Sequence, residues 1–159
     1  MVRRCGVMGA VTWNEIARRL DGAQVYWLNT TNPSGAPDAS PVWGVVTENT
    51  MYFYSERSTV KARNISQDPR IVVHLESCTD VVIVHGRAVD IGHPIENPEV
   101  VLHFERKYSE PDEVPFLALS DPCFDVMYRL EPSRALAWAL PDTEGSTVRW
   151  RAEMRDESG

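Results

Sequence analysis

Short runs of aromatic and β-branched residues, separated by strong turn signals, dominate the first third of this 159-residue chain. Gln24–Thr31 and Ala39–Thr47 are two such runs. Between them lies Asn-Pro-Ser-Gly, residues 32–35, a sequence typical of a tight turn. Glu48-Asn49 then separates the second run from a third, Met51–Ser55. The pattern predicts a meander of short antiparallel strands joined as hairpins.

The rest of the chain predicts further strands and a few helices. Helical spacing of apolar residues indicates helices over about 13–20, over about 58–66, and from Pro98, a residue favoured at the first helical position. Further strands are predicted at Ile71–Leu75, Asp80–Ile91, Phe124–Leu130, Arg134–Leu140 and Thr147–Ala152. Val81–Val84 is apolar on both faces, as expected for a barrel strand that is also covered outside, and Gly86 marks a bulge or bend.

Together these elements predict a mainly β fold with peripheral α-helices: one antiparallel β-barrel of six or seven strands. The length fits a single domain, which we place at residues 12–152. Residues 1–11 are expected to be flexible and residues 153–159 to be frayed.

Composition excludes several classes of function. The 16 basic and 23 acidic residues give a net charge of −7, which disfavours a general nucleic-acid binder, and no aromatic-basic stripe indicates an oligonucleotide-binding barrel. No run is long enough to cross a bilayer, and the N-terminus is a poor secretion signal. Three scattered cysteines without a CxxC pair predict neither a disulfide nor a zinc site. We therefore expect a cytoplasmic protein.

One strand-to-helix turn, YSERSTVKARN (Tyr54–Asn64), concentrates hydroxyls and cations. A helix N-terminus offers unpaired backbone N–H groups and a partial positive charge, which favour an anion such as phosphate. Ser58 is predicted as the N-cap, with Lys61 one turn inside and Ser55 and Arg57 just before. Serine also caps helices for purely local reasons, so the stretch alone leaves open a solvated, capped surface helix.

The ordered set of motifs around this turn resembles the pyridoxamine 5′-phosphate oxidase-like family of split β-barrels, which bind flavin or deazaflavin. The segments VYWLNTTNPSGAPDASPVWGVVTENTMYFYSERSTVKARNISQDPRIVVHL and VVIVHGRAV carry the likeness, which extends over about residues 10–140. Its most specific part is a strand ending in Ser, then S-x-x-K-x-x-N, then D-P-R, here Ser55, Ser58, Lys61, Asn64, Asp68, Pro69 and Arg70.

The resemblance implies a role for particular residues. The cofactor phosphate would be held by Ser55, Arg57, Ser58 and Lys61. The strand at Pro41, Val42 and Trp43 would hydrogen-bond the ring system through its backbone, and Tyr54 would flank the ribityl chain. The family is typically homodimeric with the cofactor at the interface, so that Trp138 of a second copy would complete each site.

The resemblance leaves the cofactor open between FMN and the deazaflavin coenzyme F-420. The C-terminal part, RALAWALPD followed by TVRWRAEM, departs from the Arg and His set with which true pyridoxamine phosphate oxidases grip their substrate. Pyridoxal phosphate synthesis is therefore not expected. Arg57 or Arg63 could serve the anionic tail of the deazaflavin, although Arg63 also fits a solvated helix position.

Two functions remain after these steps. The first is an oxidoreductase that transfers hydride between the cofactor and a small organic substrate, with no dedicated catalytic side chain. The second is a carrier of flavin, haem or tetrapyrrole without turnover. His74 and His85, on neighbouring predicted strands, are the pair that could approach each other, but the four histidines form no HxH or HExxH motif and no metal site is predicted.

Overall fold

The protein, known here from a computed structural model, is described over residues 12–109 and 121–153. Its sheet contains seven strands: β1 (Val25–Thr31), β2 (Pro37–Thr47), β3 (Thr50–Ser55), β4 (Arg70–His74), β5 (Asp80–Asp90), β6 (Val126–Ala139) and β7 (Val148–Arg151). The helices are α1 (Trp13–Asp21), α2 (Val60–Gln67), the 3₁₀ turn η1 (Pro94–Glu96), α3 (Pro98–Lys107) and α4 (Thr143–Ser146). None of the helices in these residues is long and apolar enough to span a membrane.

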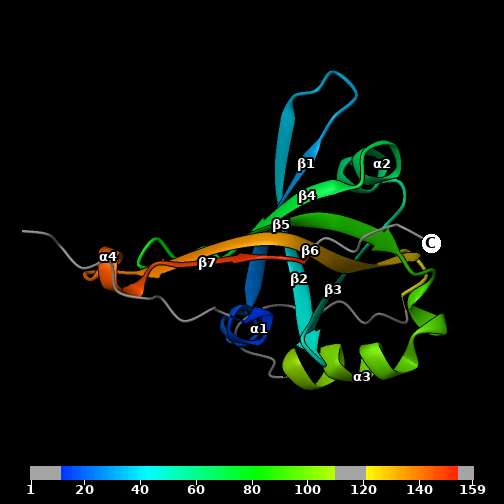
Figure 1. Cartoon of the computed structure of the whole chain (residues 1–159). Coiled ribbons are helices and arrows are strands. Elements are labelled where there is room, and N and C mark those ends of the chain that lie inside the picture. The colour runs from blue at the N-terminus through cyan, green and yellow to red at the C-terminus, as the bar shows by residue number, and fades with distance from the viewer. Residues whose placement is uncertain (1–11, 110–120, 154–159) are drawn as a thin grey trace, which may run out of the picture.

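The strands close into a six-stranded antiparallel barrel. Their order is β3-β2-β1-β4-β5-β6-β7, and an additional pairing of β3 with β6 joins the ends of the first six. β7 lies outside the closed ring and pairs only with β6, alongside which it runs in Figure 1. The predicted split barrel of six or seven strands is confirmed, with six strands in the barrel and one appended.

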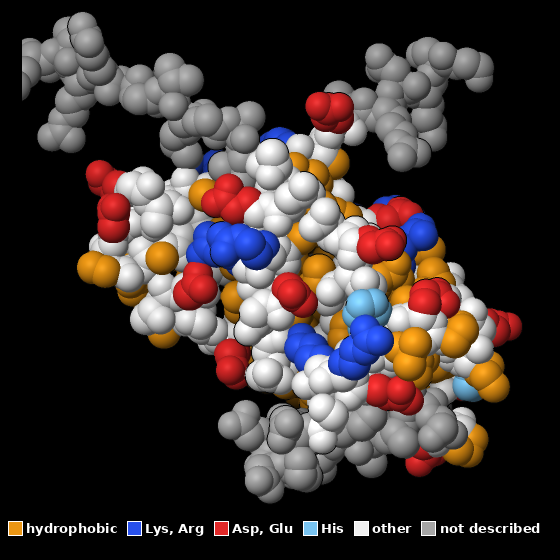
Figure 2. All heavy atoms as spheres, turned by 90° about the horizontal axis from the view of Figure 1, so that it is seen from below, with side chains coloured by type: hydrophobic (Ala, Val, Ile, Leu, Met, Phe, Trp, Pro, Cys, Tyr) orange, Lys and Arg blue, Asp and Glu red, His pale blue; other side chains and the backbone are white. Residues whose placement is uncertain are grey.

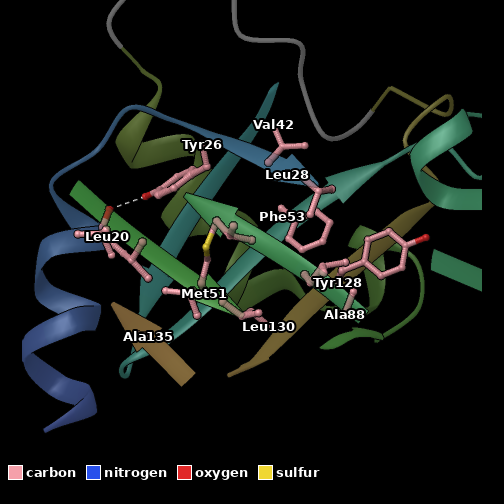
Figure 3. Packing of buried hydrophobic residues seen from close by; sticks show 14 of the residues in the cluster. Leu20, Tyr26, Leu28, Val42, Met51, Phe53, Ala88, Tyr128, Leu130 and Ala135 are labelled. Carbon is pink, nitrogen blue, oxygen red and sulfur yellow. Dashed lines mark hydrogen bonds between the residues drawn. The ribbon is translucent and has the colours of Figure 1, made fainter. Parts of the chain in front are cut away.

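The main core fills the barrel with alternate side chains from its strands. Tyr26 and Leu28 of β1, Met51 and Phe53 of β3, and Val73 of β4 are fully buried, and Figure 3 shows most of this set converging on one interior. The pattern also explains the doubly apolar segment of β5. Val82 and Val84 point inward and are fully buried, whereas Val81 and Ile83 lie on the outer face and are half-buried.

A second apolar cluster forms outside the barrel, beneath α3. Val100 and Phe104 of this helix and its C-cap residue Tyr108 pack against Val45 and Tyr54 of the barrel wall, together with Phe124 and Met127. In Figure 1, α1 and α3 lie at one end of the barrel and α2 lies at the other, beside β4. Figure 2 views the end that carries α1 and α3, where acidic, basic and apolar side chains are interspersed.

Two tight turns confirm the predicted meander. Asn32 accepts hydrogen bonds at its side-chain oxygen from the amides of Ser34 and Ala36, and Gly35 adopts the positive φ of 85° that such a turn requires. Glu48 and Asn49 both have positive φ, at 49° and 59°, as a two-residue hairpin between twisted strands demands. Both turns fall at the predicted positions.

The C-terminal part of the sheet differs from the prediction of separate strands at 124–130 and 134–140. One strand, β6, runs continuously from Val126 to Ala139. The residues between the two predicted strands, Glu131-Pro132-Ser133, are typical of a turn, but they form a β-bulge within β6. His85 pairs with Arg134 and Gly86 pairs with Pro132, which leaves Ser133 as the extra residue. The irregularity predicted at Gly86 is found as a register shift between His85 and Gly86, but the extra residue belongs to the partner strand β6.

The expected flexible segment, residues 1–11, lies outside the described residues, as does most of the expected frayed tail, residues 154–159. The single-domain boundaries at 12–152 stay a prediction.

Candidate functional site

A cavity of about 310 Å³ lies beside β2, β3 and the start of α2. Both strands and the helix contribute to its wall, and a single aromatic ring comes from the segment before β6. The residues that line it are Val25, Pro41, Val42, Trp43, Tyr54, Ser55, Glu56, Thr59, Lys61 and Phe124. Six of the nine residues proposed for the cofactor site are among them, namely Pro41, Val42, Trp43, Tyr54, Ser55 and Lys61.

The strand that forms one wall of the cavity changes partner as it passes. β2 pairs with β1 from Pro37 to Trp43, and its ladder with β3 starts only at Gly44. Pro41 and Val42 therefore run past the cavity before β3 comes alongside. A planar ligand in the cavity would meet strand backbone there, which is the arrangement expected for binding the polar edge of a ring.

The turn into α2 caps its helix one residue later than predicted. Thr59, not Ser58, is the N-cap: its hydroxyl accepts from the amide of Ala62 at 3.4 Å and donates to the carbonyl of Glu56 at 2.8 Å. The backbone turns between Glu56 and Thr59, because the amide of Thr59 donates to the Glu56 carbonyl, and this leaves Ser58 exposed with its hydroxyl on the Glu56 carboxylate. The prediction that Ser58 is the N-cap is therefore wrong.

Four residues of the cavity were not predicted from the sequence: the polar residues Thr59 and Glu56, and the apolar residues Val25 and Phe124. The Thr59 hydroxyl also lies 2.9 Å from that of Ser55, so that the two form a hydroxyl pair at the cavity wall. The neighbouring Ser-Thr dipeptide was the available signal, since either residue can cap a helix. Only the turn that precedes the helix decides between them.

Arg57 is directed away from the cavity by an ion pair. Its guanidinium makes two hydrogen bonds to the Asp90 carboxylate, at 2.7 and 3.2 Å, and its amide donates to Asp125 at 2.7 Å. It lines a different hollow, on the side of α2 that carries Arg63. Hydrogen bonding to Asp90 raises the pKa of Arg57, and the same pair lowers that of the Asp90 carboxyl against the opposing effect of its burial.

Trp138 also lies away from this cavity within its own chain. It sits on β6 opposite Val81, half-buried, and its carbonyl accepts a hydrogen bond from Arg19 at 3.3 Å. Its predicted contribution was to the cavity of a second copy, and that role stays a prediction.

Lys61 is the cation of the cavity wall. It is half-buried, burial lowers its pKa, and the nearby Glu56 acts in the opposite direction. None of the ion pairs found in residues 12–109 and 121–153 includes Lys61. Its charge, with the first amides of α2 and the Thr59–Ser55 hydroxyls, suits the phosphate of a ligand.

Tyr54 brings an unsatisfied hydroxyl to the same site. Its side chain is buried, and within the described chain its hydroxyl is the buried side-chain polar atom that has no hydrogen-bond partner. The ring packs edge-on against Phe104 and Phe124, with centroid separations of 5.1 and 4.8 Å. Burial raises its pKa, so the hydroxyl stays protonated. An orphaned hydroxyl costs about 1–3 kcal/mol, which a ligand atom could recover.

A buried polar network supports the cavity from the α3 side. Lys107 donates to the carbonyl of Gly44 at 2.8 Å and to the hydroxyl of Tyr26 at 3.0 Å. The Tyr108 hydroxyl accepts from the Gly44 amide at 3.0 Å and donates to the Gln24 carbonyl at 2.6 Å. The network fixes β2 at Gly44, directly after the cavity residue Trp43.

Because of Lys107, we expect the free energy of unfolding to vary with pH in the alkaline range. Burial lowers its pKa to about 8, from about 10.4 in the unfolded chain, while Asp21 acts weakly in the other direction. Between these values the unfolded state binds more protons, so the free energy of unfolding should rise with pH, by on the order of 1–2 kcal/mol. Above about pH 10 it should fall again, because burial raises the pKa of Tyr108 to about 12 and that of Tyr26 further.

Urea denaturation of the wild type and of Lys107→Met at pH 7, 8, 9 and 10 measures this dependence. The variant should lose the rise between pH 8 and 10, whereas Arg106→Met, at the exposed neighbouring position, should keep it. A rise of equal size in Lys107→Met would assign the effect to another group.

The histidines do not take part in the cavity. His74 and His85 lie on paired strands, but His74 bonds the carbonyl of Leu75 and His85 contacts Arg134. His93 caps η1, and His103 bonds Thr47. Across the described residues no group of three His, Cys, Asp or Glu side chains could hold a metal ion.

Comparison of the chain with known protein families gives one match. The family model for pyridoxamine 5′-phosphate oxidase matches residues 12–138. No curated protein matches the chain. Among solved structures, protein Atu2129 of Agrobacterium tumefaciens, of unknown function, is 28% identical with a TM-score of 0.64, and the match covers 77% of this chain but 54% of that one.

Two further structures share the fold at lower identity. An F420 reductase is 19% identical, with a TM-score of 0.58, over 74% of this chain and 93% of its own. A heme-binding protein from Mycobacterium smegmatis is 17% identical, with a TM-score of 0.64, over 91% of this chain and 60% of its own.

Proposed function

Because this chain belongs to the pyridoxamine 5′-phosphate oxidase family, we propose that the cavity beside β2, β3 and α2 binds FMN or coenzyme F-420 and that the protein is an oxidoreductase. One observation carries the proposal: Lys61, the hydroxyl pair of Ser55 and Thr59, and the turn into α2 line the same cavity as the β2 strand at Pro41–Trp43 and the rings of Tyr54 and Phe124.

Each wall has a separate task in this proposal. Lys61, Ser55 and Thr59 hold the phosphate, with the first amides of α2 adding hydrogen bonds. The backbone at Pro41 and Val42 binds the polar edge of the ring system, and Trp43 covers it. Tyr54 donates its unsatisfied hydroxyl to a polar atom of the cofactor. Arg57 and Ser58 are left out, since Arg57 is engaged by Asp90 and Ser58 is exposed.

The bound cofactor would supply hydride to, or accept it from, a small organic substrate. The protein's own part would be to orient the ring and exclude water. The apolar cluster beneath α3 would close one side of the cavity, because Tyr54 and Phe124 belong both to that cluster and to the cavity wall, and Trp43 packs against the cluster. Burial keeps the Tyr54 hydroxyl protonated, which suits it to donate rather than to abstract a proton.

We further infer a homodimer, from a partly exposed row on the outer face of the barrel that contains three apolar side chains and His74. Trp27 pairs with His74, His74 with Ile83, and Ile83 with Leu136, so the four side chains lie side by side across β1, β4, β5 and β6. Trp27 is 37% exposed and the other three are half-buried. A second copy would cover this row and bring Trp138 toward the neighbouring cavity.

Haem carriage has less support than flavin binding. A haem needs an axial ligand, most often histidine, and none of the chain's four histidines lines the cavity. A flavin carrier without turnover stays distinguishable from an enzyme, because only an enzyme would oxidise its reduced cofactor faster when the right acceptor is added.

Fluorescence titration of the apoprotein with FMN and, in parallel, with coenzyme F-420 tests the proposal. Lys61→Ala should weaken binding of the preferred cofactor by about 1.5–3 kcal/mol, the scale of a charge-assisted hydrogen bond. Arg63→Ala removes the same charge from an exposed position of the same helix and should leave affinity nearly unchanged. Size determination on the same samples reports whether the binding species is a dimer.

Either cofactor binding tightly would support the proposal and would identify the donor for later assays. Unchanged affinity in Lys61→Ala would remove the phosphate assignment. Binding of neither cofactor would reduce the turn at Tyr54–Asn64 to a capped surface helix.

A further inference from the structure

Four basic side chains form a cationic strip on the outer face of β5, β6 and β7: His85, Arg134, Arg149 and Arg151. The register aligns them, because His85 pairs with Arg134 and Arg134 with Arg151, while Arg149 pairs with Leu136 one step along the same face. The three arginines are exposed and His85 is half-buried. Neighbouring strands are about 4.8 Å apart, so the strip extends over roughly 10 Å from His85 to Arg151.

Although the net charge of the chain is −7, no acidic side chain among residues 12–109 and 121–153 forms an ion pair with the strip. Ion pairs in the described residues engage Arg19, Arg57, Arg70 and Arg129, and none of the strip arginines. Instead, Arg134 directly faces Arg151, and like charges opposite one another destabilise a sheet. Burial and Arg134 together lower the pKa of His85, whose Nδ1 lies 3.3 Å from the Arg134 guanidinium. Ion pairing within the described residues therefore does not account for this arrangement.

The surface is hollowed on both sides of the strip. A cavity of about 660 Å³ lies between it and Arg70 and Thr31, and a second of about 210 Å³ extends over Arg149 and Arg151. Both are lined by His85 and Arg134, so one ligand can contact the strip along its length. β7 is not needed to close the barrel, which closes through β3 and β6, yet it contributes two of the three arginines.

We propose that the cationic strip binds a small organic polyanion, a molecule that carries two or more phosphate or carboxylate groups. Guanidinium groups bind both kinds of anion through paired, parallel hydrogen bonds. One anionic group between Arg134 and Arg151 would relieve their mutual repulsion, and a second would reach Arg149. His85 would accept from Arg134 and hold its guanidinium toward the ligand.

Within one chain this site is separate from the proposed cofactor cavity, and it borders the row that a second copy would cover, because Arg149 pairs with Leu136 of that row. None of the four strip residues lines that cavity, and Arg134 lies four positions along β6 from Trp138. The proposal therefore does not depend on the identity of the cofactor, or on whether a cofactor binds.

Calorimetric titration of the whole protein with pyrophosphate, citrate and acetate, at matched ionic strength and pH 7, tests the proposal. Pyrophosphate, citrate or both should bind saturably, and acetate should bind far more weakly, because a single carboxylate can contact Arg134 and Arg151 but cannot also reach Arg149. The double variant Arg134→Gln/Arg151→Gln should bind roughly tenfold to a hundredfold more weakly. Its thermal midpoint without ligand should not fall, since the change removes a repulsive pair.

Three control variants test whether binding depends on the strip itself. Arg18→Gln/Arg106→Gln makes the same change in net charge at exposed positions elsewhere and should bind like the wild type. Lys61→Ala should keep the anion binding that the Arg134→Gln/Arg151→Gln variant loses, because Lys61 lies in the cofactor cavity and not on the strip. Arg134→Lys/Arg151→Lys keeps the charge but loses the paired hydrogen-bond geometry, and should fall between the wild type and the Gln variant.

Binding of pyrophosphate alone would identify a phosphorylated ligand, and binding of citrate alone a polycarboxylate. The absence of saturable binding by both would overturn the proposal. Equal loss of affinity in Arg134→Gln/Arg151→Gln and in Arg18→Gln/Arg106→Gln would also overturn the proposal, because the effect would then depend only on net charge. Loss in Lys61→Ala would overturn it too, by moving the anion to the cofactor cavity.

Discussion

Replacement of Gly86 by alanine is expected to destabilise the protein by about 3 kcal/mol or more. A β-carbon at Gly86 would lie 2.3 Å from the carbonyl oxygen of Glu131 and 3.0 Å from the α-carbon of Pro132. Both obstacles are backbone, so no side chain can rotate away. Relief requires β5 and β6 to separate at the bulge, and these two strands form the longest ladder of the barrel.

Urea denaturation of the wild type and the variant would measure this loss. Gly22→Ala is the matched control: Gly22 has a φ of −70° at the end of α1, and a β-carbon there would be 3.7 Å from its nearest neighbour. The control should be neutral or stabilised by up to about 1 kcal/mol. Similar stabilities for Gly86→Ala and the wild type would mean that the bulge can open at little cost.

Replacement of Phe104 by alanine should remove about 3–5 kcal/mol from the free energy of unfolding. Phe104 is fully buried in the cluster beneath α3, where it contacts Tyr54 edge-on and lies parallel to Tyr108. Truncation leaves a void behind Tyr54. The same change should weaken cofactor binding, because Tyr54 forms part of the cavity wall.

Leu102→Ala controls for the helix itself. Leu102 is on α3 but is 50% exposed, and its truncation should cost less than about 0.5 kcal/mol. Denaturation midpoints and cofactor titrations should be measured on both variants. If Phe104→Ala lowered stability but left affinity intact, the α3 cluster would have no part in shaping the cavity.

Elements that depend on local alternation and turn chemistry could be predicted from the sequence. The β1–β2 hairpin follows from an Asn-Pro-Ser-Gly turn whose side-chain hydrogen bonds are made within five residues. The extended run at 80–91 and the Pro98 helix follow from apolar periodicity and from the fixed φ of proline. The six cavity residues were named by another route, the family resemblance, which rests on the motif at Tyr54–Asn64 and on the strand at Pro41–Trp43.

Interactions between distant segments could not be predicted in this way. Arg57 belongs to a run that reads as an anion site, but Asp90 on β5 engages its guanidinium, and only the closed barrel brings the two together. Lys107 reads as the last residue of a surface helix, yet it reaches Tyr26 and Gly44. Glu131-Pro132-Ser133 is typical of a turn, and the sequence does not reveal that it stays in the strand, because the residue that it pairs with, Gly86, lies on another strand.

The pairing that closes the barrel also determines when the cofactor cavity can exist during folding. Four of the six strand pairs in the barrel, β1–β2, β2–β3, β4–β5 and β5–β6, join strands that are consecutive along the chain. The pair β3–β6 forms only after the intervening helices and strands have been made. Long-range contacts of this kind close a large loop and form slowly. Tyr54 and Ser55 pair with Met127 and Val126 in that closing ladder. A chain in which β3 and β6 are not yet paired therefore has no complete cavity. A cofactor that binds the cavity would stabilise the closed barrel relative to such a chain.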